Sequence, residues 1–141
     1  MSRFEIGQKA SFSKTISEYD VYSFAGITGD FNGVHVNRLE AEKSIFGGQV
    51  AHGCLVSSFI STVLGMMLPG KGTILLEMNV RYERPVHIGD TIKASVEITN
   101  IEAKRATLDV AVYVCECNDE GVLVEKTRVV SGNSKVMLPQ E

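Results

Sequence analysis

The chain has 141 residues, a formal net charge of −3, and 44% hydrophobic residues. These values are typical of one packed domain, which we expect to span residues 1–141. The mild acidity argues against nucleic acid or an anionic membrane surface as the main partner. The N-terminus lacks the apolar core of a signal peptide, and the most apolar stretch, residues 54–68, is too short to span a bilayer. We therefore expect a cytoplasmic protein without a membrane segment, and the three cysteines fit a reducing compartment.

The first third of the chain predicts one strand followed by helices. Residues 9–16 alternate loosely and predict the strand. Ser17 is a candidate N-cap for a first helix because its hydroxyl can accept from a free backbone N–H, and Gly29 is the expected stop. Asn37 is a second candidate N-cap, with Glu40 placed to bond back to it.

The middle and the end of the chain predict a long helix and then strands. A glycine-rich loop over residues 47–53 leads into residues 54–68, which are apolar or small on every side. Such a helix is usually surrounded by protein. The strand-like runs that follow are long and β-branched, and they cover residues 74–83, 91–101, 106–117 and 122–136. Helices first and an antiparallel meander afterwards predict an α+β fold, with one apolar helix wrapped by a curved sheet.

A glycine-rich segment, expected to be non-helical, places Asp30 and His35 five residues apart. A carboxylate and an imidazole can together perform general acid–base chemistry, if the carboxylate has a dry environment to which Phe31 and Val34 could contribute. The alternative is a capped turn, in which Asp30 and Asn32 bond to nearby backbone N–H groups. Asn32 is predicted to organise the loop. Local spacing offers no third ligand for a metal.

A second candidate group is the backbone of Gly53, which opens the apolar helix. Its N–H is expected to be free at the positive end of the helix dipole, where it could stabilise charge on a carbonyl oxygen. His52 is interpreted as packed or backbone-bonded, and His87 as structural. Ser61, two turns after Gly53, needs a partner, either a backbone carbonyl or a site carboxylate. Cys54 is interpreted as core filler.

Residues 24–35, with Ala41 beyond them, resemble the hydratase motif of (R)-specific enoyl-CoA hydratases, which belong to the MaoC-like group of hot-dog proteins. The resemblance continues through residues 51–53, 68–72 and 84–90 and covers essentially the whole chain. It implies a hot-dog fold and a homodimer whose two sheets join, with active sites near the interface. It implies no cofactor, because coenzyme A is part of the substrate.

Carried over by position, the resemblance makes Asp30 and His35 the catalytic pair, Gly53 the donor to the thioester oxygen, and Ser61 a support for Asp30. The chain departs from the family at Gly33, where proline usually follows the asparagine. Glycine releases the backbone freedom that proline restricts, so we expect a looser or differently shaped loop.

The expected reaction is the reversible hydration of a trans-2-enoyl-CoA to the (R)-3-hydroxyacyl-CoA. Three alternatives remain open: a 3-hydroxyacyl-carrier-protein dehydratase, a hot-dog acyl-CoA thioesterase, and a non-catalytic acyl-thioester binding module. Four basic side chains could contact a phosphate, although a solvated surface role is favoured for each: Lys71, Arg81, Arg84 and Arg105.

Overall fold

The computed structural model describes residues 3–140, so Met1, Ser2 and Glu141, including the first residues of the stretch tested for a signal peptide, lie outside the described part. The elements in chain order are β1 (Lys9–Thr15), α1 (Glu18–Thr28), α2 (Gly33–Val36), α3 (Arg38–Lys43), α4 (Gly53–Met66), β2 (Ile74–Tyr82), β3 (Thr91–Glu102), β4 (Arg105–Cys117) and β5 (Leu123–Met137). Every strand predicted from the sequence is present, and no strand end differs from the prediction by more than one residue.

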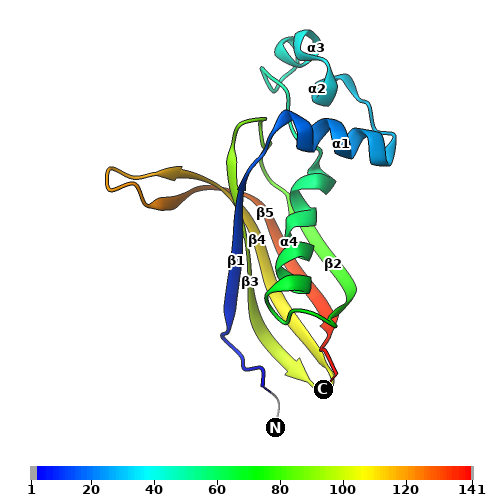
Figure 1. The fold of residues 1–141 in the computed structure, drawn as a ribbon, viewed down its shortest axis with the longest axis vertical. Coiled ribbons are helices and arrows are strands. Elements are labelled where there is room, and N and C mark those ends of the chain that lie inside the picture. Colours follow the sequence, from blue (N-terminus) through cyan, green and yellow to red (C-terminus); the bar gives the residue numbers. More distant parts are fainter. Residues whose placement is uncertain (1–2, 141) are drawn as a thin grey trace.

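One antiparallel sheet, in the order β1-β3-β4-β5-β2, curves around α4 (Figure 1). Alternation along β3 explains why one face of the sheet packs in the core: Ile92, Ala94, Val96 and Ile98 are buried, while the residues between them are not. The expected hot-dog fold, a central apolar helix wrapped by an antiparallel sheet, is confirmed.

The expectation that α4 is surrounded by protein on every side is wrong for a single chain. The sheet covers one side of the helix, where Val56, Ile60 and Val63 are buried. Ser61 on the other side is exposed, and Met66 at the end of the helix keeps 64% of its surface accessible. One sheet can cover only one face of a helix, so an apolar helix of this kind leaves a face for another layer.

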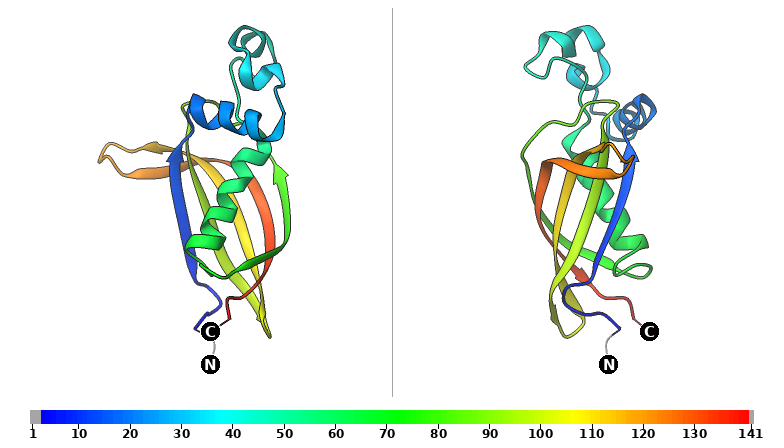
Figure 2. Two further views of the ribbon diagram at one scale, coloured as in Figure 1. Left: turned by 45° about the vertical axis from the view of Figure 1, so that its right-hand side comes forward. Right: turned by 90° about the vertical axis from the view of Figure 1, so that its left-hand side faces the viewer.

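The segment after α1 forms a small lobe, residues 29–48, that contains α2 and α3 and projects beyond the end of the sheet (Figures 1 and 2). The predicted cap of α3 is present, since the Asn37 side chain accepts from the Glu40 N–H at 3.1 Å. The expected return bond from the Glu40 side chain is not made, because the Asn37 N–H already donates to the Gly33 carbonyl at 2.8 Å.

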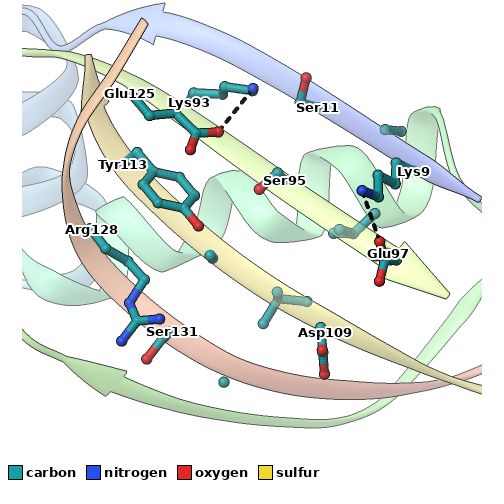
Figure 3. Close-up of a pocket in the computed structure, with 15 residues that line it drawn as sticks. Lys9, Ser11, Lys93, Ser95, Glu97, Asp109, Tyr113, Glu125, Arg128 and Ser131 are labelled. Atoms are coloured by element: carbon teal, nitrogen blue, oxygen red, sulfur yellow. Dashed lines mark hydrogen bonds and ion pairs between the residues drawn. The ribbon is translucent and has the colours of Figure 1, made fainter. Parts of the chain in front are cut away.

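The sheet face opposite α4 carries a charged hollow of about 670 Å³ (Figure 3). Ion pairs cross it at 3.1 Å each: Lys9 of β1 pairs with Glu97 of the neighbouring β3, and Lys93 of β3 pairs with Glu125 of β5 across the intervening β4. The predicted site residues do not line this hollow. Among the described residues, no helix has both the length and the apolar character needed to cross a bilayer.

Candidate functional site

The end of α1 and a turn after it place Asp30. Gly29 ends the helix with φ 81°, in the left-handed region. The Thr28 hydroxyl then accepts from the Asp30 N–H at 3.2 Å, and the Asp30 carboxylate accepts from the Asn32 N–H at 3.2 Å. Asn32 in turn caps α2 by accepting from the Val34 N–H at 3.3 Å. The predicted organising role of Asn32 is therefore present, and the turn orders Asp30 while leaving it exposed.

His35 lies inside α2, so the expectation of a wholly non-helical segment is wrong; the Asn32 cap allows one short helix to form there. Its Nδ1 lies 2.7 Å from the Val50 carbonyl oxygen. Because a carbonyl oxygen only accepts, Nδ1 carries the proton, and Nε2 of the neutral ring remains an acceptor. The Gln49 amide also donates to the His35 carbonyl at 2.8 Å. These bonds tie the imidazole to the loop before α4.

Gly53 begins α4, and the preceding His52 makes no side-chain cap bond. The first N–H groups of a helix have no intrahelical acceptor, so they can serve a bound oxygen. A Cβ on Gly53 would lie 3.0 Å from a carbon of the Tyr82 ring. That ring is held by a 2.9 Å hydrogen bond between the Tyr82 and Ser57 hydroxyls. Glycine is therefore the residue that fits this close approach.

The structure brings Asp30, His35 and Gly53 around one hollow of about 190 Å³. A second hollow of about 520 Å³ shares His35 and Gly53 and has apolar walls that include Val50 and Val56. His35 and Gly53 therefore lie where the small hollow and the larger, more apolar hollow adjoin.

Two expectations about the surroundings of Asp30 do not match the single chain. Ser61 lies about 12 Å further along α4 than Gly53, from the rise of an α-helix. Within residues 3–140, no hydrogen bond joins Ser61 to Asp30. Phe31 is 62% exposed, so it does not shield the carboxylate. Ser57 is instead the buried serine of α4, which sequence reasoning did not single out.

His52 is the site residue whose full contacts the sequence did not reveal. It is 4% exposed, and its Nε2 lies 2.9 Å from the Asp30 carbonyl oxygen. Its ring stacks on His35 with centroids 3.8 Å apart and on Phe24 at 4.9 Å. The interpretation of His52 as packed and backbone-bonded is confirmed, but its partners are the two candidate catalytic residues. His87 also has a backbone partner, the Phe46 carbonyl at 2.8 Å.

Ligand atoms of Asp30, His35 and His52 all lie within 4.8 Å of one another, a cluster that local spacing in the sequence did not show. The His35 and His52 rings are inclined by only 23° in their stack. Nitrogen lone pairs lie in the ring planes, and the two stacked planes are offset from each other, so one ion does not readily lie in both planes, as ligation by both rings requires. The geometry favours water and an organic substrate over a metal.

Gly33 has a local explanation in the structure. A Cβ at this position would overlap the carboxylate of Glu40, which lies over the first residue of α2. The obstacle is the far end of the flexible Glu40 side chain. A larger residue at position 33 would therefore require only that Glu40 moves.

The family described as "MaoC like domain" matches residues 3–119. The chain belongs to the MaoC-like family. Its relatives include the (R)-specific enoyl-CoA hydratase of Rhodospirillum rubrum, 39% identical over 94% of this chain and 87% of that protein. The 3-hydroxybutyryl-CoA dehydratase of Methylorubrum extorquens is 38% identical over 84% of this chain and 75% of that protein.

Solved MaoC-like structures have the same architecture. The (R)-hydratase from A. caviae involved in PHA biosynthesis matches with a TM-score of 0.86 and 34% identity, over 99% of this chain and 100% of that chain. The family resemblance expected from the motif around Asp30 and His35 is therefore confirmed.

Proposed function

We propose that the chain is an (R)-specific enoyl-CoA hydratase that reversibly adds water to a trans-2-enoyl-CoA. One observation carries the proposal: Asp30, His35 and the uncapped N-terminus of α4 at Gly53 line the same hollow. The groups for activating water and for polarising a thioester thus meet at one place. The relatives named hydratase and dehydratase support the same reaction in its two directions.

In the proposed mechanism, the Gly53 N–H donates to the thioester oxygen and draws electrons away from the β-carbon. Asp30 and the Nε2 of His35 hold the water. The water oxygen bonds to the β-carbon, its proton passes to Asp30, and the electron pair of the double bond forms an enolate stabilised by Gly53. The proton taken up by Asp30 is then delivered to the α-carbon on the same face, either through the Nε2 of His35 or by the pair acting together, so that both groups return to their starting states. No cofactor takes part, and the larger, more apolar hollow beside Gly53 receives the acyl chain.

We further propose that the working form is a homodimer. Strand β2 lies at the sheet edge, and its residues Ile74 and Leu75 are 55% and 43% exposed. An exposed apolar edge strand is a template for pairing with another chain. In the single chain, no other layer covers the open face of α4, and Asp30 and Phe31 are exposed to solvent. A second copy would supply the dry surroundings that an aspartate base needs.

We also propose the extent of the domain and the cellular compartment of the protein. Residues 120–140 lie beyond the family match, yet β5 pairs along most of its length with β4, so we take the whole chain as one hot-dog domain. Cys54, Cys115 and Cys117 are free, as is usual for a cytoplasmic protein.

The deciding experiment follows the ultraviolet absorbance of a conjugated enoyl-CoA with purified protein. We expect hydration by the wild type and losses of about 10²- to 10⁴-fold in kcat for Asp30→Asn and for His35→Ala, the usual range for a lost general acid or base. Asp119→Asn, in the exposed β4–β5 turn, is the matched control and should retain activity. Wild-type rates in both site variants would contradict the assignment.

Other outcomes of the same assay select the alternatives. Release of free thiol from a saturated acyl-CoA, without hydration, would identify a thioesterase. Binding without turnover in calorimetry would identify a binding module. An enoyl carrier protein tested beside a series of enoyl-CoA chain lengths separates the two carriers.

A further inference from the structure

We propose that His52 is a positioning residue that holds Asp30 and His35 in their working arrangement; the proposal rests on the hydratase function proposed above. His52 belongs to the start of α4, whereas Asp30 and His35 belong to the lobe of residues 29–48. One buried side chain contacts both members of the pair and directly precedes Gly53 in the chain. It therefore links the groups that handle water to the group that polarises the thioester.

The first link is a hydrogen bond to the backbone of Asp30. The Nε2 of His52 lies 2.9 Å from the Asp30 carbonyl oxygen, so Nε2 carries the proton and donates. Among residues 3–140, the other hydrogen bonds of Asp30 reach only to Thr28 and Asn32, two residues away on either side. The bond from His52 spans 22 residues of sequence and anchors the turn to the core helix.

The second link is the stack of His52 on the ring of His35, with centroids 3.8 Å apart. The hydrogen bond from His35 Nδ1 to the Val50 carbonyl fixes one edge of that ring, and His52 supports its face. Phe24, stacked on His52 at 4.9 Å, braces His52 in turn. The Val50 carbonyl and the His52 ring together hold the His35 imidazole in one orientation.

The third observation is that one ring nitrogen of His52, Nδ1, is buried without a hydrogen-bond partner among the described residues. A buried polar atom without a partner destabilises the folded state, and a phenylalanine would fill much the same space without that cost. Buried unsatisfied groups in native proteins call for an explanation, and a catalytic role is one of them. The two links to Asp30 and His35 supply it.

The test separates the two links with two variants. His52→Phe keeps a ring to stack on His35 and loses the donor to Asp30, whereas His52→Gln keeps an N–H donor and loses the ring. We expect each to lower kcat by about 10-fold or more with KM changed by less than about 3-fold, because small displacements of reacting groups are costly. His52→Phe loses both the bond to the Asp30 carbonyl and the unpaired Nδ1, and because these two changes oppose each other, we expect its unfolding temperature to stay near that of the wild type.

The matched control is His87→Phe. It removes a similar bond, from an imidazole Nε2 to the Phe46 carbonyl, and neither residue lines the hollow of about 190 Å³. It should retain kcat while losing stability. The proposal is overturned if His52→Phe keeps its kcat, or if kcat falls only in step with stability and KM. Should His52→Phe not fold, the same comparison is made with His52→Gln.

Amide hydrogen exchange of residues 30–35 provides a readout that is independent of activity. We expect faster exchange of the Asn32 and His35 amides in both His52 variants and unchanged exchange in His87→Phe. If the wild type hydrates no enoyl thioester, the proposed function fails, and the exchange rates still decide whether His52 orders the segment. Unchanged exchange in both His52 variants overturns the positioning role.

Discussion

The lobe of residues 29–48 and the body formed by α4 and the sheet contribute to the site in different ways. In the lobe, short-range polar bonds such as those of Asp30 and Asn32 order an exposed backbone. In the body, Gly53 begins a helix whose core residues, Ile60 among them, are fully buried. The groups proposed to hold water thus lie on an exposed segment, and the group proposed to polarise the thioester lies at the start of a helix with a buried core. Activity and stability should therefore respond separately to changes in the two regions.

The largest contrast is expected from the same substitution made in each region. Gly53→Ala should lower kcat/KM by about 10²-fold, similar to the loss of an oxyanion donor, because its Cβ meets the fixed Tyr82 ring and displaces the start of α4. Gly33→Ala is the matched control: its Cβ meets only the movable end of Glu40, so most activity should remain. Equal losses in the two variants would show that the lobe is as rigid as the body.

A second prediction concerns the body alone. A Cβ on Gly132 of β5 would overlap the backbone carbonyl of Asn79 in β2. Gly132→Ala should therefore lower the free energy of unfolding by about 1–3 kcal/mol, the usual cost of overpacking. Gly26→Ala is the control, because the space beside Gly26 in α1 is open, and it should stabilise by about 0.5–1 kcal/mol. Denaturant titration measures both, and a neutral Gly132→Ala would contradict a tight β2–β5 contact.

The third prediction uses the capping box of Ser17 and Asp20 at the start of α1, to which Lys14 of β1 also bonds. Burial raises the pKa of Asp20, but hydrogen bonds from the Ser17 backbone and from Lys14 outweigh it, and the pKa is lowered from 3.8. A carboxylate with a lowered folded pKa stabilises the protein above its unfolded pKa and loses that contribution as the pH falls through the folded value.

Asp20→Ala should accordingly cost about 1 kcal/mol at pH 7, the typical value of a lost cap. The difference from wild type should shrink when the pH is taken below about 4, near the ordinary pKa of aspartate. Urea unfolding at pH 7 and at pH 3 measures it. A difference that does not change with pH would show that the carboxylate charge contributes nothing.

The smallest effect is expected from restoring the residue usual in the family. Gly33 is the first residue of α2, where proline is favoured, and Asn32 before it is extended with ψ 133°. Gly33→Pro should change the free energy of unfolding by less than about 1 kcal/mol, the scale of compatible proline substitutions, and leave kcat within a few-fold. A large fall in kcat would show that Glu40 cannot move and that the lobe needs its glycine.

Local patterns predicted much of the fold because they act over a few residues. The alternation along residues 91–101 and the cap at Ser17 each depend on near neighbours, and both are present. The short helix containing His35 escaped prediction because four residues carry too little periodicity. The stacking of His52 on His35 could not be predicted either, because it joins a residue of α2 to the residue that precedes α4, and no local pattern places the two rings together.

Residue types and their spacing were enough to predict an apolar helix wrapped by a curved antiparallel sheet and to single out Asp30, His35 and Gly53 as candidate groups, and the resemblance of the motif around Asp30 predicted the hot-dog family. The three-dimensional structure was needed to show that these three residues share one hollow, that Ser61 lies away from Asp30 in the single chain, and that His52 connects the pair to α4. The physical reason is that such contacts depend on how the lobe meets the end of the sheet, and no local rule of the chain fixes that geometry.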